Sequence, residues 1–115
     1  MTQVNWIGGS GKSYPHEVHS WPPRLLGLGI SGSGNYIFVR RVPDGWVPIY
    51  IGQGDFSERL TTNHHKYDCI SRKGATEVHV MVNPNEQDRL AVESDLLRKY
   101  TGAYSPTGCN EKTGG

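Results

Sequence analysis

One short stretch, residues 47–60, constrains the chain more than any other. It begins with β-branched, apolar and aromatic residues, which are typical of a buried strand. Gly52 and Gly54 then interrupt this pattern, and Asp55 followed three residues later by Glu58 is typical of the start of a helix. The stretch therefore predicts a strand, a tight turn and a helix N-terminus in succession, an arrangement that lets a ligand approach the backbone and favours anions.

The predicted helix starts near Asp55 and runs to about Lys66. Phe56 and Leu60 continue an apolar stripe at helical spacing. Arg59 lies in the same part of the helix, so the turn would bring it close to the end of the preceding strand.

A second strand is expected just before this stretch, because residues 36–39 are apolar or aromatic throughout and residues 43–45 read Pro-Asp-Gly, a turn signal. Together they predict a β-hairpin with Tyr36 on one strand and Tyr50 on the other. A plain two-residue turn would place the two tyrosines on opposite faces of the hairpin, whereas an odd loop or a bulge would place them on the same face. Both alternatives stay open.

A third strand is expected over residues 76–82, which alternate between two faces. The next helix is expected over residues 86–101, with Asn85 as its cap. Its apolar stripe consists of Leu90, Leu96, Leu97 and Tyr100, and its solvated charges are Asp88, Asp95 and Lys99. Glu93 falls in the middle of the stripe, and a carboxylate there is unfavourable unless it is paired or binds a metal.

These elements predict an α/β (α+β) fold in which a three-stranded, mainly antiparallel sheet is flanked by helices. Residues 34–112 would form this domain. Residues 1–33 would be an N-terminal extension that adds a hairpin and a linker, and residues 113–115 would be a disordered tail.

The chain has 115 residues, so it is expected to form one domain. Its net charge is only +1, so any nucleic-acid contact must come from a local basic patch. Its two cysteines are too few for a disulfide framework. Neither a signal-peptide pattern nor a long apolar run is seen, which predicts a soluble, cytoplasmic protein that does not bind membranes.

Five features within residues 34–110 resemble the GIY-YIG nuclease superfamily and occur in the same order. They are Gly34-Asn35-Tyr36, Tyr50-Ile51-Gly52, Arg59, Glu93 and Asn110. The first triplet has Asn35 where the family usually has isoleucine. The resemblance implies a GIY-YIG fold and a metal-dependent endonuclease that hydrolyses DNA phosphodiester bonds.

The resemblance also implies a role for each catalytic residue. Tyr36 and Tyr50 would act at the attacking water, and Arg59 would bind a phosphate oxygen. Glu93 would be the ligand of Mg²⁺ or Mn²⁺. Asn110 would position a side chain or a phosphate by hydrogen bonds.

Further residues are expected to support this site. One of His64 and His65 would contact phosphate or a catalytic side chain. Basic residues that would follow the nucleic-acid backbone are Arg40, Arg41, Lys66, Arg72 and Lys73. DNA is the expected partner, with RNA as an open alternative. No sequence-reading motif is visible, so a second copy of the chain or a protein partner would supply specificity.

Two alternatives remain. The chain could be a non-catalytic nucleic-acid-binding or interaction domain that retains the fold, although the presence of Glu93 favours an enzyme. It could also be a zinc hydrolase whose ligands are His64, His65, Cys69 and Cys109. Adjacent residues of a helix point about 100° apart, which argues against two adjacent histidines on one metal.

Overall fold

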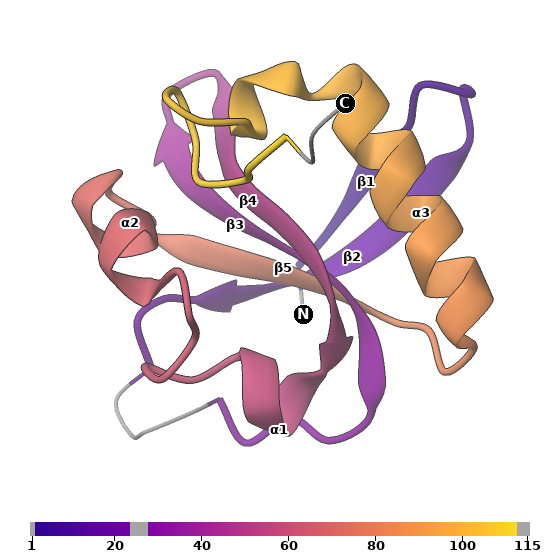
Figure 1. Ribbon diagram of the computed structural model, residues 1–115, viewed down its shortest axis with the longest axis horizontal. Helices are drawn as coiled ribbons and strands as arrows, with labels where there is room; N and C mark the ends of the chain where they lie inside the picture. Colours follow the sequence, from indigo (N-terminus) through magenta and orange to yellow (C-terminus); the bar gives the residue numbers. More distant parts are fainter. Residues whose placement is uncertain (1, 24–27, 113–115) are drawn as a thin grey trace.

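The computed structural model describes residues 2–23 and 28–112. Its centre is a curled, five-stranded antiparallel sheet with the strand order β1-β2-β5-β3-β4 (Figure 1). The strands are β1 (Gln3–Ile7), β2 (Ser13–Ser20), β3 (Ser33–Val42), β4 (Gly45–Asp55) and β5 (Glu77–Val82). The expected disordered tail, residues 113–115, and part of the expected linker, residues 24–27, lie outside the described residues.

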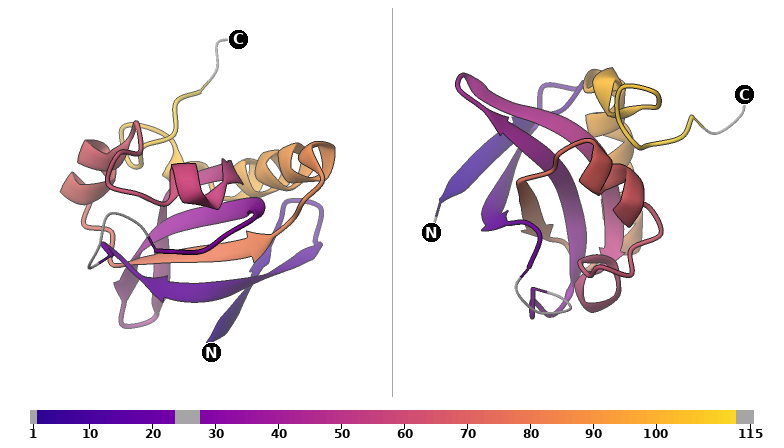
Figure 2. Two further views of the ribbon diagram at one scale, coloured as in Figure 1. Left: turned by 90° about the horizontal axis from the view of Figure 1, so that it is seen from below. Right: turned by 90° about the vertical axis from the view of Figure 1, so that its left-hand side faces the viewer.

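Helices cover both faces of the sheet around β4. They are α1 (Phe56–Arg59), α2 (Tyr67–Arg72), α3 (Glu86–Lys99) and the 3-10 turn η1 (Thr101–Ala103). The core that contains Tyr36 and Phe38 lies beneath α1 and α2, whereas the core that contains Ile37 and Val39 lies beneath α3. β4 ends the strand order, so its free edge lies between the two sets of helices, and Figure 2 shows the N-terminal hairpin on the opposite side of the molecule from the C-terminal loop.

The prediction of an α/β fold with a three-stranded sheet is wrong. The N-terminal hairpin is present, but β2 pairs with β5 and extends the same sheet to five strands. The first two strands alternate polar and apolar residues because one face of an antiparallel sheet can face water. From β1, Trp6 is buried in the core beneath α3 and Val4 packs partly against it, so the hairpin gave a weak sequence signal.

The predicted helix over residues 55–66 is also wrong, because it divides into two short helices. Asp55 caps the first one as expected, and its side chain accepts a hydrogen bond from the Glu58 amide. The helix ends after one turn, where the Thr61 hydroxyl accepts a hydrogen bond from the Asn63 amide. Such local side-chain bonds compete with helical ones, and α2 begins only at Tyr67.

The helix expected over residues 86–101 is present as α3, with Asn85 as its cap, but its buried face differs from the prediction. Leu90 is 46% exposed, and Asp95, expected in solvent, is only 7% exposed. The carboxylate of Asp95 accepts hydrogen bonds from the Ser10 hydroxyl at 2.6 Å and the Tyr14 hydroxyl at 2.7 Å. The helix is rotated toward these partners, which come from the N-terminal hairpin.

None of the helices in the described part of the chain is both long and apolar enough to cross a bilayer.

Candidate active site

A β-bulge decides the relative position of Tyr36 and Tyr50. The β3–β4 turn has two residues, because Val42 lies opposite Gly45. That turn alone would place the tyrosines on opposite faces, but the register shifts by one residue at Ile49, so that Tyr50 lies opposite Phe38. Both tyrosines consequently face the same side, and their stacked rings have centroids 6.3 Å apart.

The two glycines after Tyr50 make room for catalytic candidates. A Cβ atom at Gly52 would lie 2.6 Å from the Oη atom of Tyr36, so the tyrosine ring lies across the β4 backbone. Gly54 has a φ of +143°, and a Cβ atom there would lie 2.9 Å from Nε of Arg59. The glycines therefore let the side chains of Tyr36 and Arg59 lie against β4 at its outer edge.

His64 makes a direct hydrogen bond to Tyr36. Its Nε2 atom lies 3.0 Å from Tyr36 Oη, and its Nδ1 atom accepts a hydrogen bond from the Lys66 amide at 3.0 Å. Burial, aided by the neighbouring positive groups, lowers the pKa of His64 to about 4, so the ring is neutral at pH 7. Because Nδ1 is an acceptor, the ring proton is on Nε2 and is donated to Tyr36. The hydroxyl proton of Tyr36 is thus left to donate elsewhere.

Arg59 and Glu93 act electrostatically on both tyrosines. Burial raises the pKa of Tyr36, the charges of Tyr50 and Glu93 raise it further, and the Arg59 guanidinium opposes them. Burial also raises the pKa of Tyr50, again with Glu93 adding to the effect and Arg59 opposing it. Both hydroxyls are consequently protonated at neutral pH, and the four groups share one electrostatic environment.

Glu93 reaches this environment from α3. Its side chain is half-buried, and burial raises the pKa of the carboxyl although Arg59 opposes the shift. Glu93 has no hydrogen bond or ion pair with any residue that the structure describes, so its oxygens are available to a ligand. The described residues contain no group of three or more acidic, histidine or cysteine side chains that could hold a metal. A single available carboxylate still fits Mg²⁺, which keeps most of its waters.

Asn110 contacts the backbone of β4 rather than the open site. Its Oδ1 atom accepts a hydrogen bond from the Ile51 amide at 2.8 Å, and its Nδ2 atom donates to the Ile51 carbonyl at 2.9 Å. The amide of Cys109 also donates to the Ile49 carbonyl at 2.8 Å. The C-terminal loop thereby fixes the edge of β4 on both sides of Tyr50.

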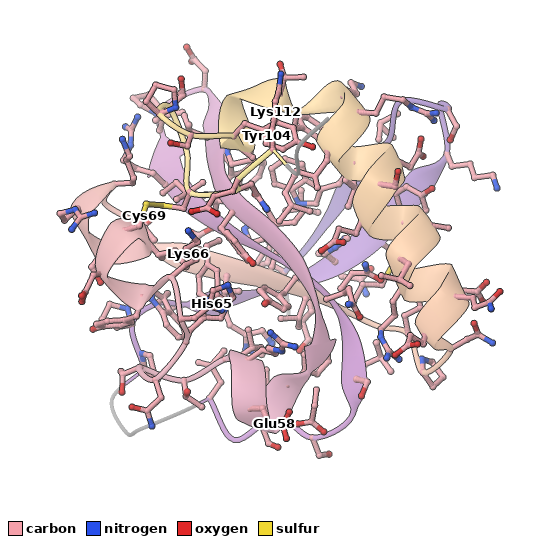
Figure 3. The ribbon with its side chains drawn as sticks, in the orientation of Figure 1. Glu58, His65, Lys66, Cys69, Tyr104 and Lys112 are labelled. Carbon is pink, nitrogen blue, oxygen red and sulfur yellow. A yellow bond between two sulfur atoms is a disulfide. The ribbon has the colours of Figure 1, made fainter. Side chains whose placement is uncertain are left out.

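A pocket of about 260 Å³ opens beside these groups. Its lining consists of Glu58, Arg59, Asn63, His64 and His65. His65 is exposed and stacks on His64 with ring centroids 4.5 Å apart. In Figure 3, His65 and Lys66 lie on the α2 side of β4, and Glu58 lies on α1. Glu58 and Asn63 also line the pocket, although neither was predicted from the sequence as a site residue.

The zinc hypothesis loses half of its ligands. Cys69 and Cys109 form a disulfide that joins α2 to the loop after η1. A disulfide sulfur offers no thiolate to a metal. His64 is also engaged at both ring nitrogens, by Tyr36 and by Lys66.

The five basic residues do not form one free patch. Lys66 pairs with Glu111 at 2.7 Å and Arg41 pairs with Glu77 at 3.0 Å, while Lys73 donates to the Pro106 carbonyl. Arg40 and Arg72 are exposed, and Arg40 approaches Gly74 just beyond α2. Of the five, Lys66 is the one that adjoins His64.

The structure therefore brings Tyr36, Tyr50, Arg59 and Glu93 close enough for their charges to affect one another. His64 is hydrogen-bonded to Tyr36, and Asn110 is hydrogen-bonded to the edge of β4. Nothing in the sequence indicated that His64, rather than His65, would contact Tyr36. That choice depends on the break between α1 and α2, which places both histidines outside a helix. Searches of protein-family models, curated proteins and solved structures found no match to the chain.

Proposed function

We propose that the protein is a GIY-YIG-type endonuclease that hydrolyses DNA phosphodiester bonds with the help of a divalent metal ion. The observation that carries the proposal is that Tyr36 and Tyr50 stack on the same face of the hairpin, with Arg59 against Gly54 at the end of β4 and Glu93 near enough to raise the pKa of both hydroxyls. Tyr36 and Tyr50 come from β3 and β4, and Arg59 and Glu93 come from α1 and α3. Along the chain, β3 and β4 are followed by α1, α2, β5 and α3.

Arg59 would bind the phosphate. Its side chain lies against Gly54 and lines the pocket beside Tyr50, so the guanidinium is available at the edge of β4. A guanidinium can hold two phosphate oxygens at once and carries a fixed positive charge. Arg59 would therefore orient the phosphodiester and stabilise the charge that develops on it.

Tyr36 would orient the attacking water. His64 donates to Tyr36 Oη, which leaves the hydroxyl proton and one lone pair for a second partner. Burial keeps this hydroxyl protonated at neutral pH, so it acts as a hydrogen-bonding group unless a nearby cation lowers its pKa. The stacked Tyr50 ring limits the side from which a water can approach.

Glu93 would hold Mg²⁺ or Mn²⁺, because its carboxylate is only half-buried and has no hydrogen-bond or ion-pair partner among the described residues. A bound divalent ion supplies charge stabilisation and assists the leaving oxygen in phosphoryl chemistry.

A plasmid-nicking assay tests the proposal. Wild type, Glu93→Gln and Arg59→Ala are each incubated with supercoiled DNA in Mg²⁺ and in EDTA. We expect nicking by the wild type in Mg²⁺ alone, and a loss of at least about 100-fold in both variants. An RNA substrate run in parallel distinguishes the two nucleic acids.

Two outcomes would contradict the proposal. Nicking that survives both substitutions would place the activity elsewhere or in a contaminant. DNA binding without cleavage by any form would instead favour a non-catalytic nucleic-acid-binding domain.

A further inference from the structure

A buried asparagine links the strand of Tyr36 to the helix of Glu93. Asn35 is fully buried, and its Nδ2 atom donates to the main-chain carbonyl of Arg89 at 2.9 Å. In an α-helix that carbonyl is also the acceptor for the amide four residues later, which is the amide of Glu93. The neighbour of Tyr36 is thus bonded to the peptide group that supports the backbone of Glu93.

The side chain of Arg89 completes the connection to β4. Arg89 is 9% exposed, and its Nε atom donates to Oε1 of Gln53 at 3.0 Å. Its Nη1 atom donates to the carbonyls of Asn83 and Pro84 at 3.1 and 2.9 Å. No carboxylate pairs with this guanidinium in the part of the chain that the structure describes. A cation held only by neutral oxygens is costly to bury, so the arrangement calls for a reason other than stability.

Gln53 lies between Gly52 and Gly54 and directly opposite Asn35 in the β3–β4 pair. The same two strands carry Tyr36 and Tyr50, and the same two glycines lie beneath Tyr36 and Arg59. The contacts of Asn35, Gln53 and Arg89 therefore connect the catalytic edge of the sheet to the first turns of α3.

We infer that Asn35, Gln53 and Arg89 are positioning residues, a polar clamp that holds the carboxylate of Glu93 in place relative to the hydroxyl of Tyr36. The catalytic consequence of the clamp rests on the proposed function, but the placement of Glu93 does not. The clamp also gives a reason for an asparagine at position 35, since an apolar side chain there could not reach the Arg89 carbonyl with a hydrogen bond.

A second anchor of α3 provides the control. Asp95 accepts hydrogen bonds from the amide and the hydroxyl of Ser10 at 2.9 and 2.6 Å. This anchor ties α3 to the N-terminal hairpin, which carries none of the proposed catalytic residues. Loosening it should therefore weaken the helix without moving Glu93 relative to Tyr36.

The test compares Gln53→Met, which keeps the side-chain volume but loses the acceptor, with Ser10→Ala. Arg89→Lys, which keeps the positive charge, is the second clamp variant. The first readout is the hydrogen-exchange rate of the Glu93 amide, measured by NMR, because this amide donates to the Arg89 carbonyl that Asn35 also holds. The second is the Mg²⁺ concentration that gives half-maximal plasmid nicking.

Loosening the clamp should let the first turns of α3 open more often. We expect the Glu93 amide to exchange its hydrogen faster in both clamp variants than in the wild type. We also expect the half-maximal Mg²⁺ concentration to rise about 10-fold, because a metal ligand whose backbone is less firmly held binds its ion less tightly. Ser10→Ala should lower the melting temperature and change neither readout.

The inference fails if Gln53→Met and Arg89→Lys retain the wild-type exchange rate of the Glu93 amide. It also fails if Ser10→Ala shifts the two readouts as much as the clamp variants do, since that would indicate general loosening of α3. A wild type that cleaves nothing would overturn the proposed function alone, because the NMR measurement would still decide the clamp.

Discussion

Gly52 lies opposite Tyr36 in the β3–β4 pair, and a methyl group on Gly52 would lie 2.6 Å from the tyrosine hydroxyl oxygen. No heavy atoms approach so closely without a shift, so the ring must move if the glycine is replaced. The site of Tyr36 thus depends on a residue that contributes no side chain.

We predict that Gly52→Ala displaces Tyr36 from His64 and strongly reduces nicking. Overpacking of a buried contact typically costs about 1–3 kcal/mol, so the free energy of unfolding should fall by that amount. Urea denaturation and the nicking assay measure the two effects. Gly102→Ala is the matched control, because a Cβ atom there would meet nothing within 4 Å. Unchanged stability and activity in Gly52→Ala would contradict the described position of Tyr36.

Asn110→Ala should destabilise the protein by about 1–3 kcal/mol, the cost of leaving buried hydrogen-bonding groups without partners. Both backbone groups of Ile51 lose their bonds to the asparagine, and β4 loosens beside Tyr50. Urea denaturation measures the change, with Asn5→Ala at an exposed strand position as the control. Equal stabilities of the two variants would exclude this role for Asn110.

Reduction of the disulfide should lower the free energy of unfolding by about 4 kcal/mol. Cys69 and Cys109 are 40 residues apart in the sequence. The disulfide lowers the chain entropy of the unfolded state, and for a loop of this length that effect has about this magnitude. Urea denaturation with and without a reductant measures the difference. Thiol titration of the denatured, unreduced protein should find no free thiol, and two free thiols would show that the bond does not form.

The protein should lose stability as the pH falls from about 6.5 to about 4. Burial lowers the pKa of both His16 and His64 to about 4 from an ordinary value of 6.5. In this pH range the unfolded chain binds protons that the native state does not, so acid favours unfolding. Thermal denaturation between pH 4 and pH 8 should show a shallower slope for His16→Asn. A slope equal to that of the wild type would mean that His16 is not buried in its neutral form.

Local patterns were enough to predict some elements of the fold. Asp55 and Asn85 cap their helices as expected, because a cap needs only its own residue and the amides that follow. The hairpin of β3 and β4 was predictable for the same reason, since its turn and both strands are contiguous. These elements already contain Tyr36, Tyr50 and Arg59.

The remaining differences come from contacts between distant parts of the chain. The burial of Asp95 requires Ser10 and Tyr14, which are more than 80 residues away in the sequence. The helical pattern of α3 alone could not contain this information, so it favoured Leu90 as a core residue and Asp95 as a solvated one. The pattern also placed Glu93 at the centre of the buried face, whereas the buried residues of α3 are Arg89, Val92, Asp95 and Leu96 and Glu93 is only half-buried.

The bulge at Ile49 illustrates a different limit. A single extra residue decides which face Tyr50 occupies, and nothing in the sequence of β4 marks it clearly. Pro48, which precedes it, has no amide proton to give to a ladder and is compatible with a bulge at an edge strand. The structure, rather than the pattern, settles the two alternatives for the tyrosine pair.

The C-terminal loop has a consequence for how two copies of the chain could associate. Cys109 and Asn110 occupy the hydrogen-bonding groups of Ile49 and Ile51 along the outer side of β4. Strand-to-strand pairing between copies is therefore blocked along that part of β4, and β1 lies at the opposite end of the strand order. A dimer whose sheets join through β1 would form one continuous sheet of five strands from each copy, with the β4 strand of each copy, and hence each tyrosine pair, at its two outer edges.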